Sequence, residues 1–331
     1  MSDSKTPLKA TFIGGHRKTG TTMLLALLDG HPQLNTFPAD SGFFYAYFPP
    51  YESDKYTDEE RIERIIQFCY GNLEEELDKV GINKQQDFPL HHLHEVFREM
   101  ASIAGKITTP VILQLMLEAY RKCSKADTSH HIRWVEKTSS SDIYASYIFK
   151  WFPDAKFIHL VRDPRDNYAS LKSGWKKKYS NRADNVGFLR QSMIERGKLT
   201  YELARLNLER YGCDRYMVLK FEDLTADPKK ELINIASFLG IDFDESMLKP
   251  TVCGSLWDGN NFDGLRFQGP FVGNVNRWRE RIDDEEAMLI ENYFKDIMDY
   301  YGYKRVFNLG NTVDAAVKQY IWYNYNQSYS V

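Results

Sequence analysis

Residues 11–25 read TFIGGHRKTGTTMLL, and this stretch decides the fold of the chain. A short apolar run ends at two glycines and a second apolar run begins at Thr21, as where a buried parallel strand turns into a helix. Such a unit points free backbone N–H groups and the positive end of the helix dipole at an anion. The stretch therefore predicts an α/β fold with a phosphate-binding loop.

The lysine of this loop is displaced. A loop that binds ATP or GTP reads G-x-x-x-x-G-K-[ST]. Gly15 and Gly20 have this spacing, but Thr21 stands where the lysine belongs and Lys18 lies inside the loop. The displacement argues against an ordinary nucleotide triphosphatase. A glycine-rich turn can also bind nothing, so the phosphate hypothesis depends on the polar side chains crowded there, namely Arg17, Lys18, Thr19, Thr21 and Thr22. We expect Thr19 or Thr21 to cap the helix.

A second anion site is predicted about 140 residues later. The apolar run KFIHLV at 156–161 leads into RDPRDNYAS at 162–170. Pro164 is suited to start a helix, with Asp163 as its N-cap. This places Arg162 at a strand end and Ser170 about two turns into the helix. A guanidinium and a hydroxyl so placed suit a phosphate monoester, although a surface ion pair of Arg162 with Asp163 or Asp166 explains the arginine equally well.

The two motifs together resemble the PAPS-dependent sulfotransferases, whose donor is 3′-phosphoadenosine 5′-phosphosulfate (PAPS). GGHRKTGTTMLLALLDGHPQL (14–34) is similar to their 5′-phosphosulfate loop, and FIHLVRDPRDNYASLKSGW (157–175) to their 3′-phosphate motif. Residues 218–241 and 275–303 resemble two further blocks, in the right order. The likeness is to the branch of tyrosylprotein, carbohydrate and bacterial enzymes. We expect a three-layer αβα sandwich around a mostly parallel sheet, as in P-loop NTPases, forming a single domain over residues 1–331.

The resemblance implies roles for individual residues. Lys18 is expected to contact the bridging oxygen and sulfonate of PAPS, where charge grows as the S–O bond breaks, so no metal is expected. The donor-binding residues implied are Arg17, Lys18, Thr19, Gly20, Thr21 and Thr22 for the 5′ end, Arg162 and Ser170 for the 3′-phosphate, and Phe221 for adenine. The sequence leaves open which further arginine completes the 3′-phosphate site among Arg266, Arg277 and Arg279.

The acceptor side is less defined. Many relatives place a histidine after a Lys-Thr pair, and here Lys137 and Thr138 are present without it. Lys137 is still expected to contact the sulfonate. A hydroxyl acceptor usually needs a general base within hydrogen-bond reach. Asp40 is the candidate base, unless it caps a helix that starts near Ser41, and His16 is the alternative.

Residues 50–130 are predicted to form a helical insertion within the domain, with helices near 57–69, 91–103 and 110–122. Such insertions commonly set acceptor choice. The run HHLHE at 91–95 suggests a metal site, but neighbouring histidines point to different helix faces, so we expect no metal there. The tail 304–331 is rich in Tyr and Trp, which is compatible with packing on the body, covering the acceptor pocket or forming a homodimer contact.

Composition bounds the remaining choices. The 331 residues are 43% hydrophobic, enough for a large core, and the net charge of −3 gives no global case for nucleic-acid binding. No apolar run is long enough to span a membrane and no signal peptide is evident, so we expect a cytoplasmic protein. We predict transfer of a sulfuryl group from PAPS to a hydroxyl, or less readily an amine, of a saccharide, lipid, small metabolite or peptide tyrosine. The alternatives are a P-loop kinase that uses ATP and magnesium, and a non-catalytic relative that binds the nucleotide.

Overall fold

A parallel sheet of five strands, in the order β2-β3-β1-β4-β5, forms the centre of the part of the chain that the structure describes. The structure is a computed structural model that describes residues 8–46, 55–82, 88–124, 128–178, 192–259, 270 and 272–307. The strands are β1 (Lys9–Gly14), β2 (Leu34–Thr36), β3 (Arg133–Lys137), β4 (Lys156–Val161) and β5 (Tyr216–Lys220). The loop motif identified in the sequence follows β1, which lies between β3 and β4.

Successive residues of β1 and of β4 enter different hydrophobic clusters. Phe12 lies in one cluster and Ile13 in the other, and the same alternation is found for Phe157 and Ile158 on β4. Because side chains alternate across a strand, both faces of the sheet are buried. The predicted three-layer α/β sandwich with a parallel sheet is confirmed.

Helices cover both faces of this sheet. The face with Phe12 packs against helices of the insertion and α7, and the face with Ile13 packs against α1 and α12. The helices before β4 are α1 (Thr21–Leu28), α2 (Phe43–Ala46), α3 (Asp58–Arg64), α4 (Gly71–Lys79), α5 (Leu90–Ile103), α6 (Thr109–Cys123) and α7 (Ala145–Trp151). Those after β4 are α8 (Pro164–Lys178), α10 (Lys198–Tyr211), α11 (Phe221–Ala226), α12 (Pro228–Leu239), α13 (Trp278–Arg281), α14 (Asp284–Tyr293) and α15 (Lys295–Tyr301). A short hairpin joins β6 (Thr251–Val252) to β7 (Ser255–Leu256).

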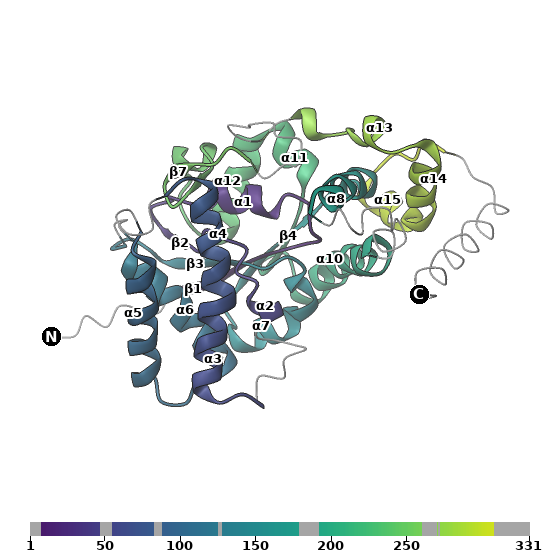
Figure 1. Cartoon of the computed structure of the whole chain (residues 1–331). Helices are drawn as coiled ribbons and strands as arrows, with labels where there is room; N and C mark the ends of the chain where they lie inside the picture. Colours follow the sequence, from purple (N-terminus) through teal and green to yellow (C-terminus); the bar gives the residue numbers. More distant parts are fainter. Residues whose placement is uncertain are drawn as a thin grey trace.

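The predicted insertion is helical where the structure describes it. Thr57 forms a capping box with Glu60 at the start of α3, as the run TDEE suggests. The predicted end at Cys69 is wrong, because a π-helical stretch over Ile65–Tyr70 carries the helix on into α4. Leu73 and Leu77 continue the apolar face of the helix, and their burial in the core stabilises the longer helix. Figure 1 shows α3, α4 and α5 side by side at one end of the molecule.

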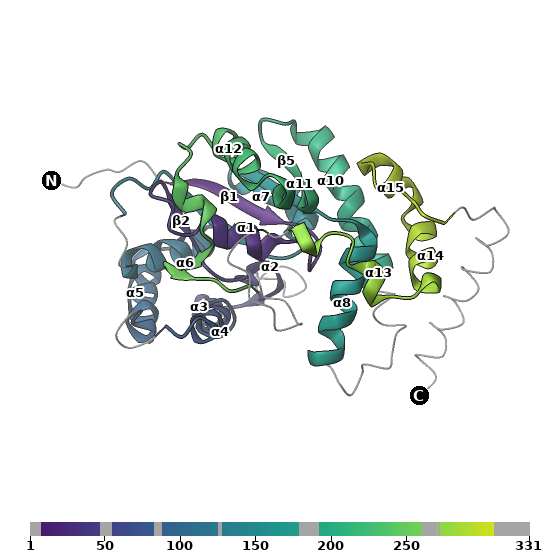
Figure 2. The same ribbon diagram turned by 90° about the horizontal axis from the view of Figure 1, so that it is seen from above.

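The C-terminal helices form a third cluster with α8 and α10, at the other end of the molecule in Figures 1 and 2. Glu291 of α14 accepts hydrogen bonds from the N–H groups of Val306 and Phe307, the last described residues. The aromatic tail from 308 onward lies outside the described residues. The division into one domain with an insertion at 50–130 and a tail at 304–331 stays a prediction. Among the helices described, none is long and apolar enough to cross a membrane.

Candidate active site

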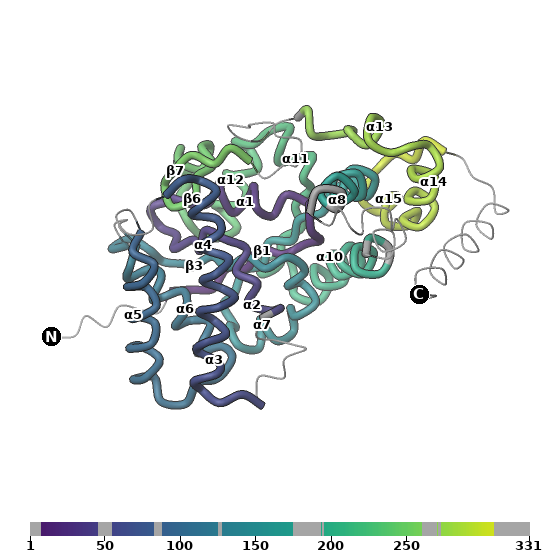
Figure 3. The backbone as a smooth tube through the Cα atoms, viewed as in Figure 1, coloured from purple at the N-terminus to yellow at the C-terminus, as the bar shows by residue number. Residues whose placement is uncertain are grey.

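The loops that follow β1, β3 and β4 meet at one edge of the sheet. Ile13 pairs with Lys137 of β3, and Gly14 pairs with His159 of β4. Parallel strands end at the same edge, so the loop after β1 lies beside the residues that follow both neighbours. Figure 3 follows the chain from β1 into the loop that approaches α8. The strand order therefore brings the two motifs, which the sequence separates by about 140 residues, to the same edge of the sheet.

Both glycines of the phosphate-loop spacing are required by the local geometry. Gly15 has a φ of 130°, and a Cβ there would lie 2.4 Å from the carbonyl oxygen of Leu160. Gly20 has a φ of 103°, and a Cβ would lie 2.6 Å from Cδ2 of Phe221. Lys18 also has a positive φ, of 69°, which is strained for a residue with a side chain. A strained loop of this kind commonly marks a functional site.

Neither Thr19 nor Thr21 caps α1, so this expectation was wrong. Gly20 occupies the N-cap position, and no side chain accepts a hydrogen bond there. The hydroxyl of Thr19 instead donates to the carbonyl of His16 at 2.7 Å, within the loop. The first amides of α1 are thus left without a capping side chain, as binding of an external anion requires.

Arg162 connects three parts of this edge. Its Nη1 donates to the carbonyl of Lys18 at 3.1 Å, and its Nη2 donates to the carbonyl of Asn274 at 2.7 Å. Its guanidinium carbon lies 4.2 Å from the ring centroid of Phe221, and its Nε is buried without a hydrogen-bond partner in the described residues. Arg162 is therefore held between the loop and the C-terminal region, and its Nε–H is not used by either contact.

The surface ion pair considered for Arg162 is not formed. Asp163 instead binds Arg165, with 2.6 Å between Oδ2 and Nη2, and its Oδ1 accepts from the N–H of Arg165 at the start of α8. Asp166 accepts two main-chain N–H groups from residues 276–278. Both carboxylates are buried and bonded to other groups. Arg162 therefore donates to the main-chain carbonyls of Lys18 and Asn274 instead.

His16 is a buried part of the loop. It is 1% exposed, and its Nδ1 lies 2.7 Å from Oδ1 of Asn167 on α8. Burial lowers the pKa of His16 to about 4. The amide of Asn167 also donates to the carbonyl of Arg17 at 2.7 Å. Asn167 thus fixes the loop to α8, a role that sequence reasoning missed because the pairing spans 150 residues.

Asp40 and Lys137 form an ion pair next to the first turn of α1. Lys137 Nζ lies 2.6 Å from Oδ2 of Asp40 and 3.3 Å from Oγ1 of Thr22. Ser139 donates to the same carboxylate oxygen at 2.8 Å. The Asp40 side chain is 38% exposed, whereas that of Lys137 is 3% exposed. The structure therefore brings both predicted residues together beside the phosphate loop, with the Asp40 side chain partly exposed.

Asp40 does not cap the short helix that follows it. The hydroxyl of Ser41 accepts from the N–H of Phe43 at 3.1 Å, at the start of α2. Ser41 also donates to the carboxyl group of Glu136, to which Thr138 donates at 2.6 Å. Burial raises the pKa of Glu136 to about 7. These contacts fix the loop of Asp40 to the end of β3.

The helical insertion also reaches this loop. Asn72 of α4 donates through Nδ2 to the carbonyl of Asp40 at 3.0 Å and to that of Ser41 at 3.3 Å. A side chain at Gly42 would collide with Asn72, at 2.8 Å from its Nδ2. Nothing in the sequence marks Asn72 as functional, because its role depends on packing between α4 and a loop 31 residues earlier.

A second buried carboxyl group, that of Asp142, holds the phosphate loop through a hydrogen bond to its main chain. Asp142 accepts the N–H of Gly15 at 3.2 Å, and the N–H of Ser140 donates to the carbonyl of Gly15 at 2.8 Å. Burial raises the pKa of Asp142 to about 7. The loop is thereby held by the segment after β3 on one side and by α8 on the other.

The other residues predicted to bind the donor make fewer contacts with the phosphate loop. Ser170 is half-buried within α8, and Phe221 is 4% exposed against Arg162. Arg277 is half-buried and reaches the side chain of Asn274 at 3.4 Å, whereas Arg279 is exposed and stacks on Trp278. Arg266 lies outside the described residues. The described part of the chain contains no group of three His, Cys, Asp or Glu side chains that suits a metal ion.

A profile of the sulfotransferase family matches residues 10–245, which include the loop, Asp40, Lys137 and Arg162. The chain belongs to the sulfotransferase family. The resemblance to sulfotransferases noted in the sequence is thereby confirmed. Among the solved structures, this sulfotransferase is similar to the sulfotransferase domain of the Synechococcus PCC 7002 olefin synthase. The TM-score is 0.56 at 21% identity, covering 92% of this chain and 98% of that one.

Two relatives of this sulfotransferase have assigned activities. The protein-tyrosine sulfotransferase of Drosophila melanogaster is 24% identical over 238 residues, or 72% of this chain. This chain spans 39% of the length of that protein. The omega-hydroxy-beta-dihydromenaquinone-9 sulfotransferase Stf3 of Mycobacterium bovis is 21% identical over 316 residues, covering 89% of this chain and 75% of that protein.

Proposed function

We propose that this sulfotransferase moves a sulfuryl group from PAPS to a hydroxyl group of an acceptor. The observation that carries the proposal is the meeting of two anion-binding elements and an acid–lysine pair at one edge of the sheet. The uncapped start of α1 and the unused Nε of Arg162 supply donors for two separate phosphate groups. The Asp40–Lys137 pair lies beside the first of them.

On the donor side, the chain stabilises the negative charge of the leaving group. When bound, PAPS supplies an activated sulfuryl group whose S–O bond breaks to leave a 3′,5′-bisphosphate. Lys18 and the amides at the start of α1 stabilise the negative charge that develops on the 5′-phosphate oxygen. Arg162, with Ser170 and Arg277, holds the 3′-phosphate. Phe221 borders the adenine.

On the acceptor side, Asp40 is the base in this proposal. The acceptor oxygen forms a bond to sulfur while its proton passes to the Asp40 carboxylate. Lys137 keeps that carboxylate oriented and borders the sulfonate through its contact with Thr22. Asp40 is favoured over His16 because its side chain is 38% exposed, whereas His16 is 1% exposed with one ring nitrogen bound to Asn167. A base must reach the proton that it removes.

The acceptor is a small metabolite, saccharide, lipid alcohol or peptide tyrosine in this proposal. One relative named above acts on protein tyrosine and the other on an omega-hydroxy dihydromenaquinone. Both acceptors present a hydroxyl group, one phenolic and one aliphatic. A panel of acceptors should therefore include a tyrosyl peptide and a long-chain alcohol, alongside saccharides. A homodimer and a cytoplasmic location are compatible with the proposal and stay predictions.

The test is a comparison of nucleotides, followed by a transfer assay. We expect the bisphosphate product, adenosine 3′,5′-bisphosphate (PAP), to bind without magnesium and more tightly than ATP in isothermal titration calorimetry. We then expect ³⁵S label to move from PAPS to at least one member of the panel. ATP binding that requires magnesium would instead support a kinase. PAP binding without transfer to any acceptor would support a non-catalytic relative.

A further inference from the structure

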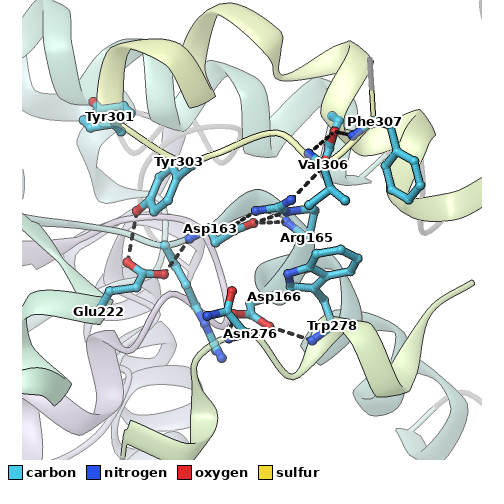
Figure 4. A network of polar contacts seen from close by, with 12 residues as sticks. Asp163, Arg165, Asp166, Glu222, Asn276, Trp278, Tyr301, Tyr303, Val306 and Phe307 are labelled. Carbon is cyan, nitrogen blue, oxygen red and sulfur yellow. Dashed lines mark hydrogen bonds and ion pairs between the residues drawn. The ribbon is translucent and has the colours of Figure 1, made fainter. Parts of the chain in front are cut away.

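The segment at 274–278 is held against α8 by one carboxylate. Asp166 accepts the N–H of Asn276 at 2.7 Å on Oδ2 and the N–H of Trp278 at 2.8 Å on Oδ1 (Figure 4). Asp166 is 2% exposed, and its bond to Trp278 is buried, whereas its bond to the exposed Asn276 is partly buried. Asn276 has a φ of 61°, in the left-handed region, which turns the chain so that both N–H groups reach the same carboxylate. The turn at this position therefore depends on Asp166.

The same segment brings two arginines to one residue. Arg162 donates to the carbonyl of Asn274 at 2.7 Å, and Arg277 reaches the side-chain oxygen of Asn274 at 3.4 Å. Two guanidinium groups at one asparagine concentrate positive charge, which the Asp166 carboxylate near Arg162 offsets only in part and a bound anion would offset further. The Nε of Arg162 is buried without a hydrogen-bond partner in the described residues. This corner is thus suited to a phosphate group, and its second arginine is carried by the segment that Asp166 holds.

The anchoring of Trp278 does not depend on Asp166 alone. Two guanidinium groups stack on its ring. The guanidinium carbon lies 4.5 Å from the ring centroid in Arg165 and 4.4 Å from it in Arg279. Arg165 is itself paired with Asp163 (Figure 4). It also forms an ion pair with Glu291. A change at Asp166 should therefore alter the turn at Asn276 while the tryptophan stays packed.

We propose that Asp166 is a positioning residue for the 3′-phosphate. It holds the turn at Asn276 so that Arg277 and Arg162 face the same phosphate group. This inference rests on the proposed function, because it takes the anion at this corner to be the 3′-phosphate of the donor. Asp166 itself touches no donor atom in this proposal and acts through Arg277.

The test compares two nucleotides that differ only in the 3′-phosphate, namely PAP and adenosine 5′-monophosphate. Asp166→Asn keeps the shape of the side chain but turns an NH₂ group toward one of the two N–H donors. We expect the affinity for PAP in calorimetry to fall by at least about tenfold, and that for the monophosphate to stay within about twofold. A merely structural role would weaken both nucleotides alike.

A matched control is available at Asp29. This buried carboxylate also holds a distant segment, by accepting the N–H of Gly254 at 3.0 Å and the hydroxyl of Thr251 at 2.7 Å. It follows the end of α1, away from the phosphate loop at the start of that helix. We expect Asp29→Asn to leave the preference for PAP unchanged.

A second variant keeps the proposal testable if Asp166→Asn fails to fold, as judged by circular dichroism. Arg277→Ala removes a half-buried side chain and should reduce the preference for PAP to a similar extent. Unchanged selectivity in Asp166→Asn, or in Arg277→Ala where Asp166→Asn does not fold, would overturn the proposal. If the wild-type protein shows no preference for PAP over the monophosphate, the proposed function itself is wrong.

Discussion

Arg162 donates a hydrogen bond to the main-chain carbonyl of Lys18, with 3.1 Å between Nη1 and the oxygen. The bond joins the end of β4 to the phosphate loop, across 144 residues of sequence. Lys18 has a positive φ of 69°, a strained conformation that the surrounding contacts, including this bond, must hold. The residue expected at the 3′-phosphate thus also supports the lysine expected at the 5′ end.

Replacing Arg162 by lysine should separate charge from geometry. One ammonium group cannot reach the carbonyls of Lys18 and Asn274 together and still contact a phosphate. We expect Arg162→Lys to weaken PAP binding by about 10- to 100-fold in calorimetry. Arg205→Lys, on an exposed pair with Glu209, is the control and should bind as the wild type does. If Arg162→Lys bound PAP as tightly as the wild type, the several donors of the guanidinium group would not be needed for binding.

Removing the charge of Lys18 should reduce the rate more than binding. Its ammonium is proposed to stabilise charge that develops only as the S–O bond breaks. We expect Lys18→Ala to lower kcat by about 10²- to 10³-fold in the ³⁵S transfer assay. Lys79→Ala, on an exposed pair with Glu76, should leave kcat unchanged. A change confined to KM would contradict the role given to Lys18.

Asp40→Asn tests the base directly. The amide keeps an oxygen for Lys137 but cannot take up the acceptor proton. We expect kcat to fall by about 10²- to 10⁴-fold while PAP affinity stays unchanged. Ser139→Ala removes a single bond to the same carboxylate and should cost less than about tenfold. Near-normal activity in Asp40→Asn would mean that Asp40 is not the base and that His16 or another group takes up the proton.

Asn72→Ala tests whether the insertion supports the base. Loss of its two hydrogen bonds should loosen the loop of Asp40 and lower kcat by about 3- to 10-fold, without a change in PAP affinity. If Asn72 acts through Asp40, the loss should disappear when Asp40→Asn is already present. Asn234→Ala, on the exposed surface of α12, serves as the control. Additive losses in the double variant would contradict the coupling.

Glu136 should make stability depend on pH. Burial raises its pKa from an ordinary 4.5 to about 7, so its full contribution to the free energy of unfolding is present below pH 4.5 and is lost as pH rises through about 7. His16, whose pKa burial lowers from 6.5 to about 4, has the opposite effect, because its contribution is lost as pH falls toward 4.

A variant isolates the Glu136 contribution from that of the histidine. Glu136→Gln mimics the protonated carboxyl, so its stability relative to wild type should rise between about pH 4.5 and 7 in urea denaturation. Glu209→Gln, on an exposed pair with Arg205, serves as the control. A constant difference in Glu136→Gln would mean that the buried carboxyl does not titrate there.

The sequence by itself determined the local chemistry of the phosphate sites. The spacing of Gly15 and Gly20 identified the loop because its backbone angles and close contacts with Leu160 and Phe221 exclude a side chain. Pro164 identified the start of α8, since its ring fixes the first helical φ. Such signals are readable because they depend on backbone conformation within a few residues.

Only the tertiary structure decided how the site is assembled. Lys137 reaches Asp40 across 97 residues, and Asp166 reaches Asn276 across 110. Such contacts depend on which strands lie next to β1 and on which helix packs beside each loop. No local pattern encodes these choices, because burial of the whole sheet sets them.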